Sequence, residues 1–248
     1  AVDLVVMELM RRFNPHTHAG AETGLVESAG AGESAQAPVA APVAWVYNTY
    51  QMYLSDALRR LQRDLDASRG EGFTFAAKVV RGAYQVQERN AAAEKGRPCP
   101  VFERKEQTDD QYNEAVRRML QRIEESGRGE RAGTGVGAGL GAGAAVVVAT
   151  HNRQSIELAL RRMAELGLAR DHPGVHIAQI MGICDNVTCA LGASGYNALK
   201  LVLFGEYEEI FPWLLRRLDE NSDLMGAPLL ERPLVMRELR RRMGMGSA

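Results

Sequence analysis

The segment Ala145 to Ala149 has the sequence AVVVA, which is short, rich in β-branched residues and apolar at every position. A strand that is apolar on both faces must be covered on both sides, as in the parallel sheets of α/β proteins. Similar strand-like segments recur at 45–48, 73–80, 175–180 and 199–204. Segments with helical periodicity lie between or after them, at 50–69, 109–126, 153–166, 185–193 and 208–221. Strands that alternate with helices, without hairpin signals, predict a parallel α/β sheet, either doubly wound or part of a barrel.

Polar side chains at the carboxyl ends of the expected strands favour the barrel. These positions are Asn48, Arg81, Thr150-His151-Asn152, Gln179 and Lys200. In a βα barrel the carboxyl ends of all strands surround one mouth, where the active site lies. With about five strands in place of eight, we predict a partial (βα)8 TIM-like barrel that contains about the last five strands with their helices.

Two low-complexity stretches, 16–44 and 126–145, are rich in Gly and Ala and poor in large apolar residues. We expect both to be inserts in one C-terminal portion of a barrel that spans 1–248. The first fourteen residues have helical periodicity without a cap, so we expect the chain to begin inside a helix of a larger protein.

Composition excludes several classes of protein. The 248 residues include 30 Lys and Arg against 31 Asp and Glu, a net charge of −1, which gives no general attraction to nucleic acid. Cys99, Cys184 and Cys189 are too few for a disulfide framework and lack partners at metal-ligand spacing, so we expect free thiols and no metal. No apolar run has the length of a membrane span.

Two further motifs are predicted not to be sites. His16 and His18 have the spacing of metal ligands, but they lie in low-complexity sequence without a third ligand. Residues 139–144 (GLGAGA) loosely match a dinucleotide-binding pattern. That pattern needs a strand before it and a helix after it, and here the order is reversed.

Arg216 and Arg217 are the strongest candidates for binding a carboxylate. Adjacent helical residues point about 100° apart, so the two guanidinium groups can reach opposite sides of one anion. Glu220 follows at helical spacing and can hold a guanidinium in place. A solvated helix face with a surface ion pair is the alternative for an isolated Arg-Arg pair.

The segment from Lys78 to Tyr84 (KVVRGAY) adds a second cationic site. Lys78 and Arg81 interrupt a strand, and Gly82 permits close approach of the backbone to a ligand. A cation beside a flavin ring stabilises the negative charge that reduction places there, and Tyr84 can line the substrate pocket. A strand end with a buried ion pair is the alternative.

Four collinear motifs resemble the proline dehydrogenase family. They are NTYQMYL (48–54), VVRGAY (79–84), ATHN (149–152) and LLRRLDEN (214–221). The resemblance extends from residue 1 to about 242 apart from the two inserts. With GICD at 182–185, the eukaryotic mitochondrial branch is the more similar one.

The resemblance implies a distorted (βα)8 barrel that binds FAD at the carboxyl mouth of its strands. The implied cofactor-binding residues are Val46, Asn48, Lys78, Arg81, Gly82, Ala83, His151, Asn152 and Gln179. The implied substrate-binding residues are Arg216, Arg217 and Glu220 for the carboxylate, and Tyr84, Met181 and Leu201 around the pyrrolidine ring. No residue is expected to act as a catalytic acid or base.

The resemblance also implies hydride transfer from C5 of L-proline to flavin N5, giving Δ1-pyrroline-5-carboxylate, with electrons passed to a quinone. A mitochondrial location, on the matrix side of the inner membrane, follows from the resemblance only. The arginine-rich C-terminal segment is expected to be a solvated helix face, and peripheral contact with a membrane is compatible with it.

Two departures from the family keep alternatives open. A lysine and an aspartate on early strands of the family have no counterpart in this sequence. Leu201 stands where proline-specific members have a tyrosine, so the ring specificity stays open between proline and hydroxyproline. A non-catalytic truncated remnant and an unrelated carboxylate-binding barrel enzyme are the remaining readings.

Overall fold

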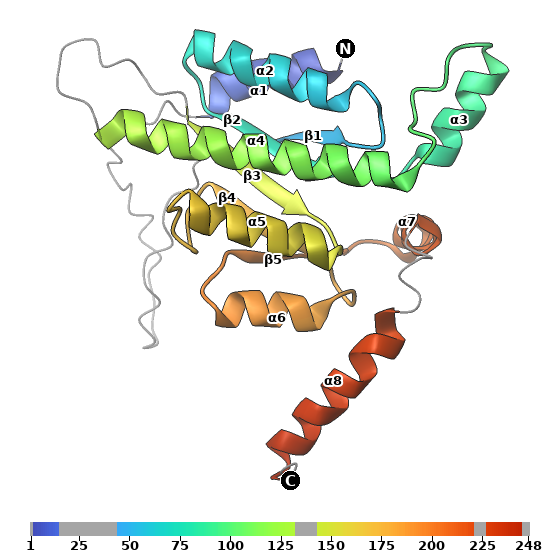
Figure 1. Cartoon of the computed structure of the whole chain (residues 1–248). Helices are drawn as coiled ribbons and strands as arrows, with labels where there is room; N and C mark the ends of the chain where they lie inside the picture. The colour runs from blue at the N-terminus through green and yellow to red at the C-terminus, as the bar shows by residue number, and fades with distance from the viewer. Residues whose placement is uncertain (1, 15–43, 132–142, 221–226, 245–248) are drawn as a thin grey trace.

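The computed structural model describes residues 2–14, 44–131, 143–220 and 227–244, and Figure 1 shows their arrangement. The strands are β1 (Asn48–Gln51), β2 (Phe75–Val80), β3 (Ala144–Ala149), β4 (Val175–Ile180) and β5 (Ala198–Leu201). The helices are α1 (Val2–Phe13), α2 (Ala57–Glu71), α3 (Gln85–Glu94), α4 (Lys105–Arg131), α5 (Arg153–Glu165), α6 (Asp185–Ala193), α7 (Tyr207–Glu220) and α8 (Ala227–Arg242).

All five strands pair in parallel, in the order β1-β2-β3-β4-β5. Helices α2, α4, α5 and α6 follow one another along one face of this sheet (Figure 1). A doubly wound sheet reverses its strand order at a switch point, whereas βα units that succeed one another with their helices on one side build a barrel. The predicted α/β fold, an open portion of a βα barrel, is therefore confirmed.

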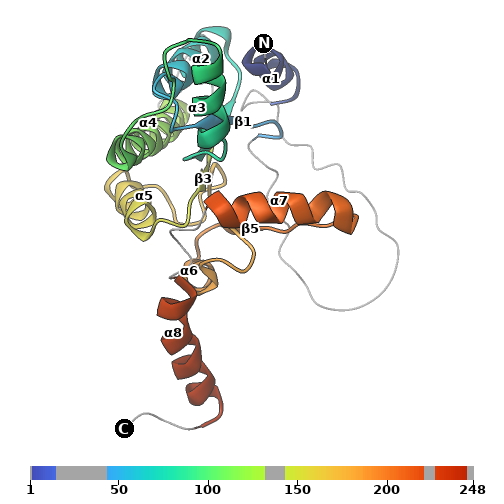
Figure 2. The same cartoon turned by 90° about the vertical axis from the view of Figure 1, so that its right-hand side faces the viewer.

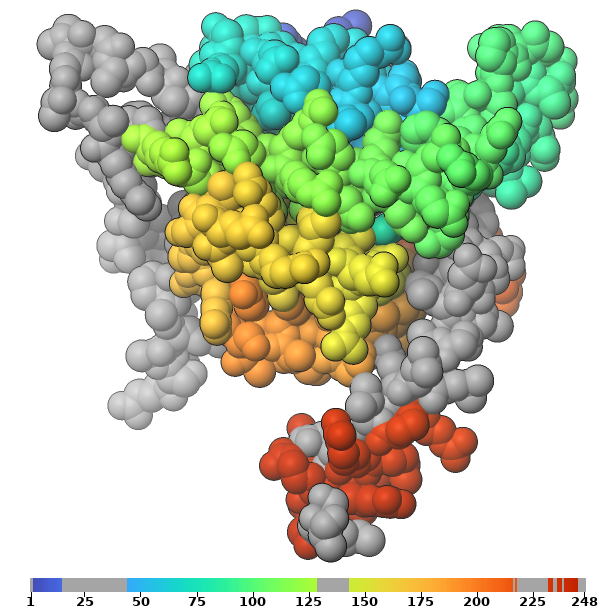
Figure 3. All heavy atoms as spheres, in the orientation of Figure 1, coloured from blue at the N-terminus to red at the C-terminus, as the bar shows by residue number. Residues whose placement is uncertain are grey.

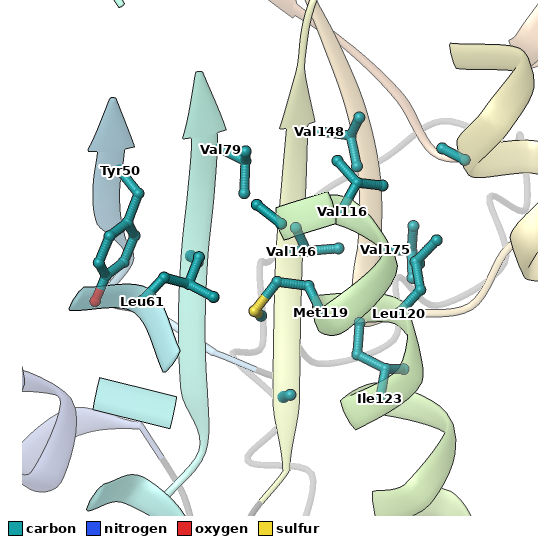
Figure 4. Packing of buried hydrophobic residues seen from close by; sticks show 14 of the residues in the cluster. Tyr50, Leu61, Val79, Val116, Met119, Leu120, Ile123, Val146, Val148 and Val175 are labelled. Carbon is teal, nitrogen blue, oxygen red and sulfur yellow. The ribbon is translucent and has the colours of Figure 1, made fainter. Parts of the chain in front are cut away.

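The main core lies between the sheet and the helices on this face. Strand residues such as Val79, Val146 and Val148 meet the apolar face of α4, which contributes Val116 and Met119 (Figure 4). Successive strand residues point to opposite faces, so every second residue of β2 and β3 enters this core. The residues between them face the other side of the sheet, where the candidate site lies.

Helix α2 illustrates how the sequence defines these elements. Ala57, Leu61 and Leu65 are buried at helical spacing. The helix ends at Gly72, whose φ of 77° is left-handed and whose N–H donates to the carbonyl of Ser68. Glycine adopts this conformation without the steric cost that a Cβ adds.

Several predicted boundaries were wrong. Residues 48–51 form β1, whereas the prediction had placed the strand at 45–48 and a helix from residue 50, because Asn48–Gln51 pair with Ala77–Val80. Helix α4 extends to Arg131 and β3 begins at Ala144, so the ends of the predicted insert 126–145 belong to regular elements. Most of both inserts, and His16 and His18, lie outside the described residues.

Helices α7 and α8 are not part of the layer formed by α2, α4, α5 and α6, although α8 contacts α6. Figure 2 shows α7 on the opposite side of the strands from α4 and α5, and α8 directed away from the sheet. The arginines of α8 are exposed, as predicted for a solvated helix face. Within the described ranges, no helix combines the length and hydropathy needed to span a bilayer.

Candidate functional site

A cavity of about 810 Å³ opens at the carboxyl ends of the strands, on the face of the sheet that α2, α4, α5 and α6 do not cover. Its lining includes most of the residues that the sequence predicted. These are Lys78, Arg81, Gly82, Ala83, Tyr84, His151, Asn152, Gln179, Leu201 and Arg217. Residues from four strand ends and from α7 thus meet in one hollow, as the barrel arrangement requires.

Lys78 and Arg217 make this cavity cationic. Arg217 comes from α7, and its guanidinium carbon lies 4.7 Å from the Trp213 ring centroid and 5.7 Å from the Tyr84 ring centroid. Burial lowers the pKa of Lys78, and the positive charge of Arg217 lowers it further. Two cations that influence each other across a partly desolvated cavity favour an anionic ligand between them.

Arg81 is fixed at the rim by several contacts with the protein. Its guanidinium donates to Asp109 Oδ1 at 2.5 Å, to Thr150 Oγ1 at 2.7 Å and to Ser155 Oγ at 2.9 Å. It also lies 4.3 Å from the Tyr112 ring centroid. The side chain therefore connects the end of β2 to α4, β3 and α5, and it lines the cavity from this fixed position.

Asp109 supports Arg81 from α4. Its second carboxylate oxygen accepts a hydrogen bond from Lys105 Nζ at 2.8 Å. Burial acts to raise the pKa of Asp109, but the hydrogen bonds from Lys105 and Arg81 outweigh it, so the pKa lies below its usual value. Asp109 is consequently an ionised partner for Arg81 at neutral pH.

Gly82 is held in a conformation that requires glycine. Its φ is 118°, and a Cβ added there would overlap the Tyr53 ring. Because no side chain intervenes, the backbone at Gly82 and Ala83 is itself part of the cavity wall. The role that the sequence suggested for Gly82, close approach of the backbone to a ligand, stays a prediction.

The segment after β3 contributes His151 and Asn152. Asn152 caps α5, because its side-chain oxygen accepts from the Ser155 N–H at 3.1 Å. Burial lowers the pKa of His151 to about 4, with a smaller effect from the charge of Lys200. The imidazole is thus neutral at physiological pH, and its buried Nδ1 has no hydrogen-bond partner among the described residues.

Gln179 forms part of the cavity floor and is only 2% exposed. Its amide nitrogen donates to the Thr150 carbonyl at 3.3 Å, and its oxygen accepts from the Thr188 hydroxyl at 2.7 Å. Both ends of the side chain are therefore bound within the protein, which fixes β4 against the end of β3 and against α6.

Three predicted residues lie elsewhere. The side chain of Asn48 points to the helix-covered face, where it donates to Asp3 Oδ1 at 3.2 Å. Val46 precedes β1 and packs against the main core. Met181 is 63% exposed and does not line the cavity. The side chains of Arg216 and Glu220 lie outside the part that the structure describes.

Sequence reasoning missed Thr49, Gln51 and Trp213, which all line the cavity. Thr49 is paired with Lys78 in the parallel register, so both residues face the same side of the sheet. The side-chain oxygen of Gln51 is buried without a hydrogen-bond partner among the described residues. The alternation of strand residues around the buried Tyr50 could have identified Thr49 and Gln51, and helical spacing from Arg217 could have identified Trp213.

The cavity therefore combines cations with an apolar wall. Val80, Ile180 and Leu201 from the strands and Trp213 from α7 provide the apolar surface. Its volume lies within the range of about 300–1,000 Å³ that is usual for small-molecule sites. Such a site suits a flat, partly apolar ligand together with an anion. Among the described residues, no cluster of His, Cys, Asp and Glu side chains could hold a metal ion.

Comparisons with known proteins identify the family. The proline dehydrogenase family model matches residues 27–227. Human mitochondrial proline dehydrogenase 1 is 38% identical over 202 residues, which cover 82% of this chain and 31% of that protein. Hydroxyproline dehydrogenase from Xenopus laevis is 36% identical over 199 residues, which cover 80% of this chain and 40% of that protein. The chain thus spans less than half of these relatives.

Solved structures show the same fold. Proline utilization A from Bdellovibrio bacteriovorus, in a crystal structure of the enzyme inactivated by N-propargylglycine, superposes with a TM-score of 0.60 at 20% identity. The match covers 71% of this chain and 16% of that one. The fold, the matched motifs and the extent of the family match agree: the chain belongs to the proline dehydrogenase family.

Proposed function

We propose that this chain forms the carboxyl-terminal part of a flavin-dependent enzyme that oxidises L-proline to Δ1-pyrroline-5-carboxylate. The observation that carries the proposal is that Lys78 and Arg217 line one cavity from opposite elements, β2 and α7. Family membership supplies the reaction class, and the cavity supplies cations for an electron-rich ring and for a substrate carboxylate.

The residues in the cavity fit FAD. The buried oxygen of Gln51 and the buried Nδ1 of His151 have no hydrogen-bond partners among the described residues, so both can meet polar groups of a ligand. Gly82 leaves its backbone open to close approach. Lys78, Gln51, Gly82, Ala83 and His151 would hold the cofactor, which when bound supplies the two-electron oxidation of a carbon–nitrogen bond.

The side chains of this chain would position the reactants and keep water away. The Lys78 ammonium stabilises negative charge beside the ring system, and its lowered pKa reflects burial in the cavity wall. Arg217 binds the substrate carboxylate, and the nearby Trp213 and Tyr84 rings hold its guanidinium in place. Leu201 and Trp213 provide the apolar surface against which a pyrrolidine ring packs.

A quinone is proposed as the electron acceptor, and the mitochondrion as the location, on the matrix side of the inner membrane. Three relatives are named as mitochondrial proline dehydrogenase 1, which supports the location. The exposed arginines of α8 are compatible with peripheral contact with anionic lipid.

Hydroxyproline is a second candidate substrate. Leu201 lines the cavity and offers an apolar surface with no hydrogen-bonding group. Relatives named hydroxyproline dehydrogenase and proline dehydrogenase match this chain with similar identities, 36% and 38%. Leu201 gives no hydrogen bond to a ring hydroxyl, so we expect L-proline to be the better substrate.

Anaerobic reduction of bound flavin tests the proposal. The protein is purified with FAD and mixed separately with L-proline and with trans-4-hydroxy-L-proline, and the visible flavin absorbance is followed. Bleaching by L-proline with formation of pyrroline-5-carboxylate is expected. Bleaching only by hydroxyproline would assign the second substrate, and retention of FAD without bleaching by either would favour a non-catalytic remnant.

A further inference from the structure

One turn of α4 faces the guanidinium of Arg81. Tyr112 and Asn113 follow Asp109 by three and four residues, so all three lie on one side of the helix. Asp109 accepts a hydrogen bond from Arg81 Nε at 2.5 Å, and the Tyr112 ring centroid lies 4.3 Å from the guanidinium carbon. Asn113 is connected to Arg81 through Ser155 of α5. This turn therefore supports Arg81 both directly and through a second helix.

The contact between Asn113 and Ser155 joins α4 to α5, which lie side by side on the face of the molecule shown in Figure 3. The Ser155 hydroxyl donates to Asn113 Oδ1 at 2.8 Å. A serine hydroxyl has one proton to donate and an oxygen that accepts. Because the proton is donated to Asn113, the oxygen accepts from Arg81 Nη2, at 2.9 Å. Ser155 is only 1% exposed, so solvent does not compete for these bonds.

Ser155 also fixes the segment after β3 that lines the cavity. Its backbone N–H donates to Asn152 Oδ1 at 3.1 Å, and the Asn152 N–H donates to Thr150 Oγ1 at 3.0 Å. The same Thr150 oxygen accepts from Arg81 Nη1 at 2.7 Å. Arg81 and residues 150–152 all line the cavity, and these bonds hold them in one arrangement.

The Arg81 guanidinium keeps hydrogen-bonding capacity for a ligand. It has five N–H groups in one rigid plane. The bonds to Asp109, Thr150 and Ser155 use one N–H each on Nε, Nη1 and Nη2. Among the described residues, these bonds leave a second N–H on each of Nη1 and Nη2. A rigid planar donor binds a phosphate well only when its plane is correctly oriented.

We propose that Ser155 and Asn113 are positioning residues that orient the Arg81 guanidinium toward the diphosphate of FAD. This inference rests on the function proposed above, because it takes FAD as the ligand of the cavity. Arg81 is the group that binds the diphosphate, and the other two residues act through it. Asp109 holds Arg81 at Nε, whereas Ser155, directed by Asn113, holds it at Nη2.

Titrations of the flavin-free full chain with FAD and with riboflavin, followed by flavin fluorescence, test this role. Ser155→Ala should weaken FAD binding by about tenfold, the usual effect of losing one charge-assisted hydrogen bond. Riboflavin has no phosphate, so its affinity should be unchanged. Asn113→Leu cannot accept the Ser155 proton and should weaken FAD binding by about threefold, again without an effect on riboflavin.

A second background separates positioning from a general structural effect. If Ser155 acts through Arg81, Ser155→Ala should have no further effect on FAD affinity in an Arg81→Met chain. Ser68→Ala is the matched control, because Ser68 is also a buried serine, whose hydroxyl donates to the Leu65 carbonyl at 2.7 Å on α2, away from the cavity. This variant should keep the affinity of the wild type for FAD.

Two results would overturn the positioning role while leaving the proposed function intact. They are equal losses of FAD and riboflavin affinity in Ser155→Ala, and a further tenfold loss of FAD affinity when Ser155→Ala is added to Arg81→Met. Reduction of the bound flavin by L-proline in the wild type shows separately that the proposed function holds. A wild-type chain that binds no FAD would overturn both.

Discussion

The guanidinium of Arg217 lies 5.7 Å from the centroid of the Tyr84 ring, so α7 meets the segment that follows β2. Tyr84 belongs to the same segment as Lys78, and both residues line the cavity together with Arg217. The two cationic motifs of the sequence, far apart in the chain, thus face a single space. This arrangement is what allows one cavity to accommodate both a cofactor ring and a substrate carboxylate.

Replacement of Arg217 should weaken substrate binding and leave the cofactor in place. We expect Arg217→Met to raise the dissociation constant for L-proline by about 10- to 100-fold, because a charge-assisted pair with a carboxylate is lost. The measurement is a titration of the FAD-loaded protein with L-proline, followed through the flavin spectrum. Arg240→Met on the exposed face of α8 is the control, and an equal effect in both variants would remove Arg217 from the site.

Asp109→Ala should disturb the cavity through Arg81. The substitution leaves Arg81 without its ionised partner at 2.5 Å, and we expect the free energy of unfolding to fall by about 1–3 kcal/mol. FAD affinity should fall as well, because the Arg81 side chain lines the cavity. Urea unfolding and FAD binding are the measurements. Asp110→Ala removes a neighbouring exposed carboxylate and should have little effect on either quantity.

Gly82→Ala should be more harmful than a glycine substitution elsewhere. The new Cβ would overlap the Tyr53 ring at a residue with a φ of 118°, so we expect a loss of about 2–4 kcal/mol in unfolding free energy. Gly96→Ala is the comparison, because Gly96 has a φ of 55° but open space around it. This substitution should lower the unfolding free energy by only about 1–2 kcal/mol. Equal losses in the two variants, measured by urea unfolding, would contradict the close packing at Gly82.

His151 should make stability depend on pH in the acid range. Its pKa is about 4 in the folded chain and about 6.5 when unfolded, so the unfolded state binds more protons between these values. The contribution of the neutral imidazole to the free energy of unfolding is fully present above about pH 6.5, and it is lost as the pH falls toward 4. The loss is on the order of 2 kcal/mol after allowance for partial exposure.

Urea unfolding at pH 7 and pH 5 of the wild type and of His151→Gln isolates this contribution. The wild type should lose more stability than the variant between the two pH values. A parallel decrease in both proteins would mean that other groups dominate in this range.

Sequence patterns predicted the fold well where periodicity was strong. The apolar strand-like segments and the helical periodicity between them predicted β3, α5, β4 and α6 nearly at their observed bounds. Helix α3 was not predicted. Among its residues only Ala92 is buried, so its sequence has no apolar stripe at helical spacing by which a helix could be recognised.

The site was predicted less completely than the fold. Motif residues such as Lys78 and His151 reach the cavity because they lie at strand ends. Asn48 does not, because it is the first residue of β1 and not the last, and it pairs with Ala77, whose side chain enters the core on the helix-covered face. Gln51 and Trp213 could not be recognised by type alone, since an amide or an indole is equally common in a core or on a surface.

Energy transfer from Trp213 to bound flavin tests the central claim most directly. The chain contains two tryptophans, so Trp45→Phe leaves Trp213 as the single emitter, on the α7 wall of the cavity. Titration with FAD should quench its emission to saturation at one FAD per chain, and Lys78→Met in the same background should weaken that titration by about tenfold. Binding of FAD that leaves Trp213 emission unchanged, or that Lys78→Met does not affect, would show that the two segments do not share one site.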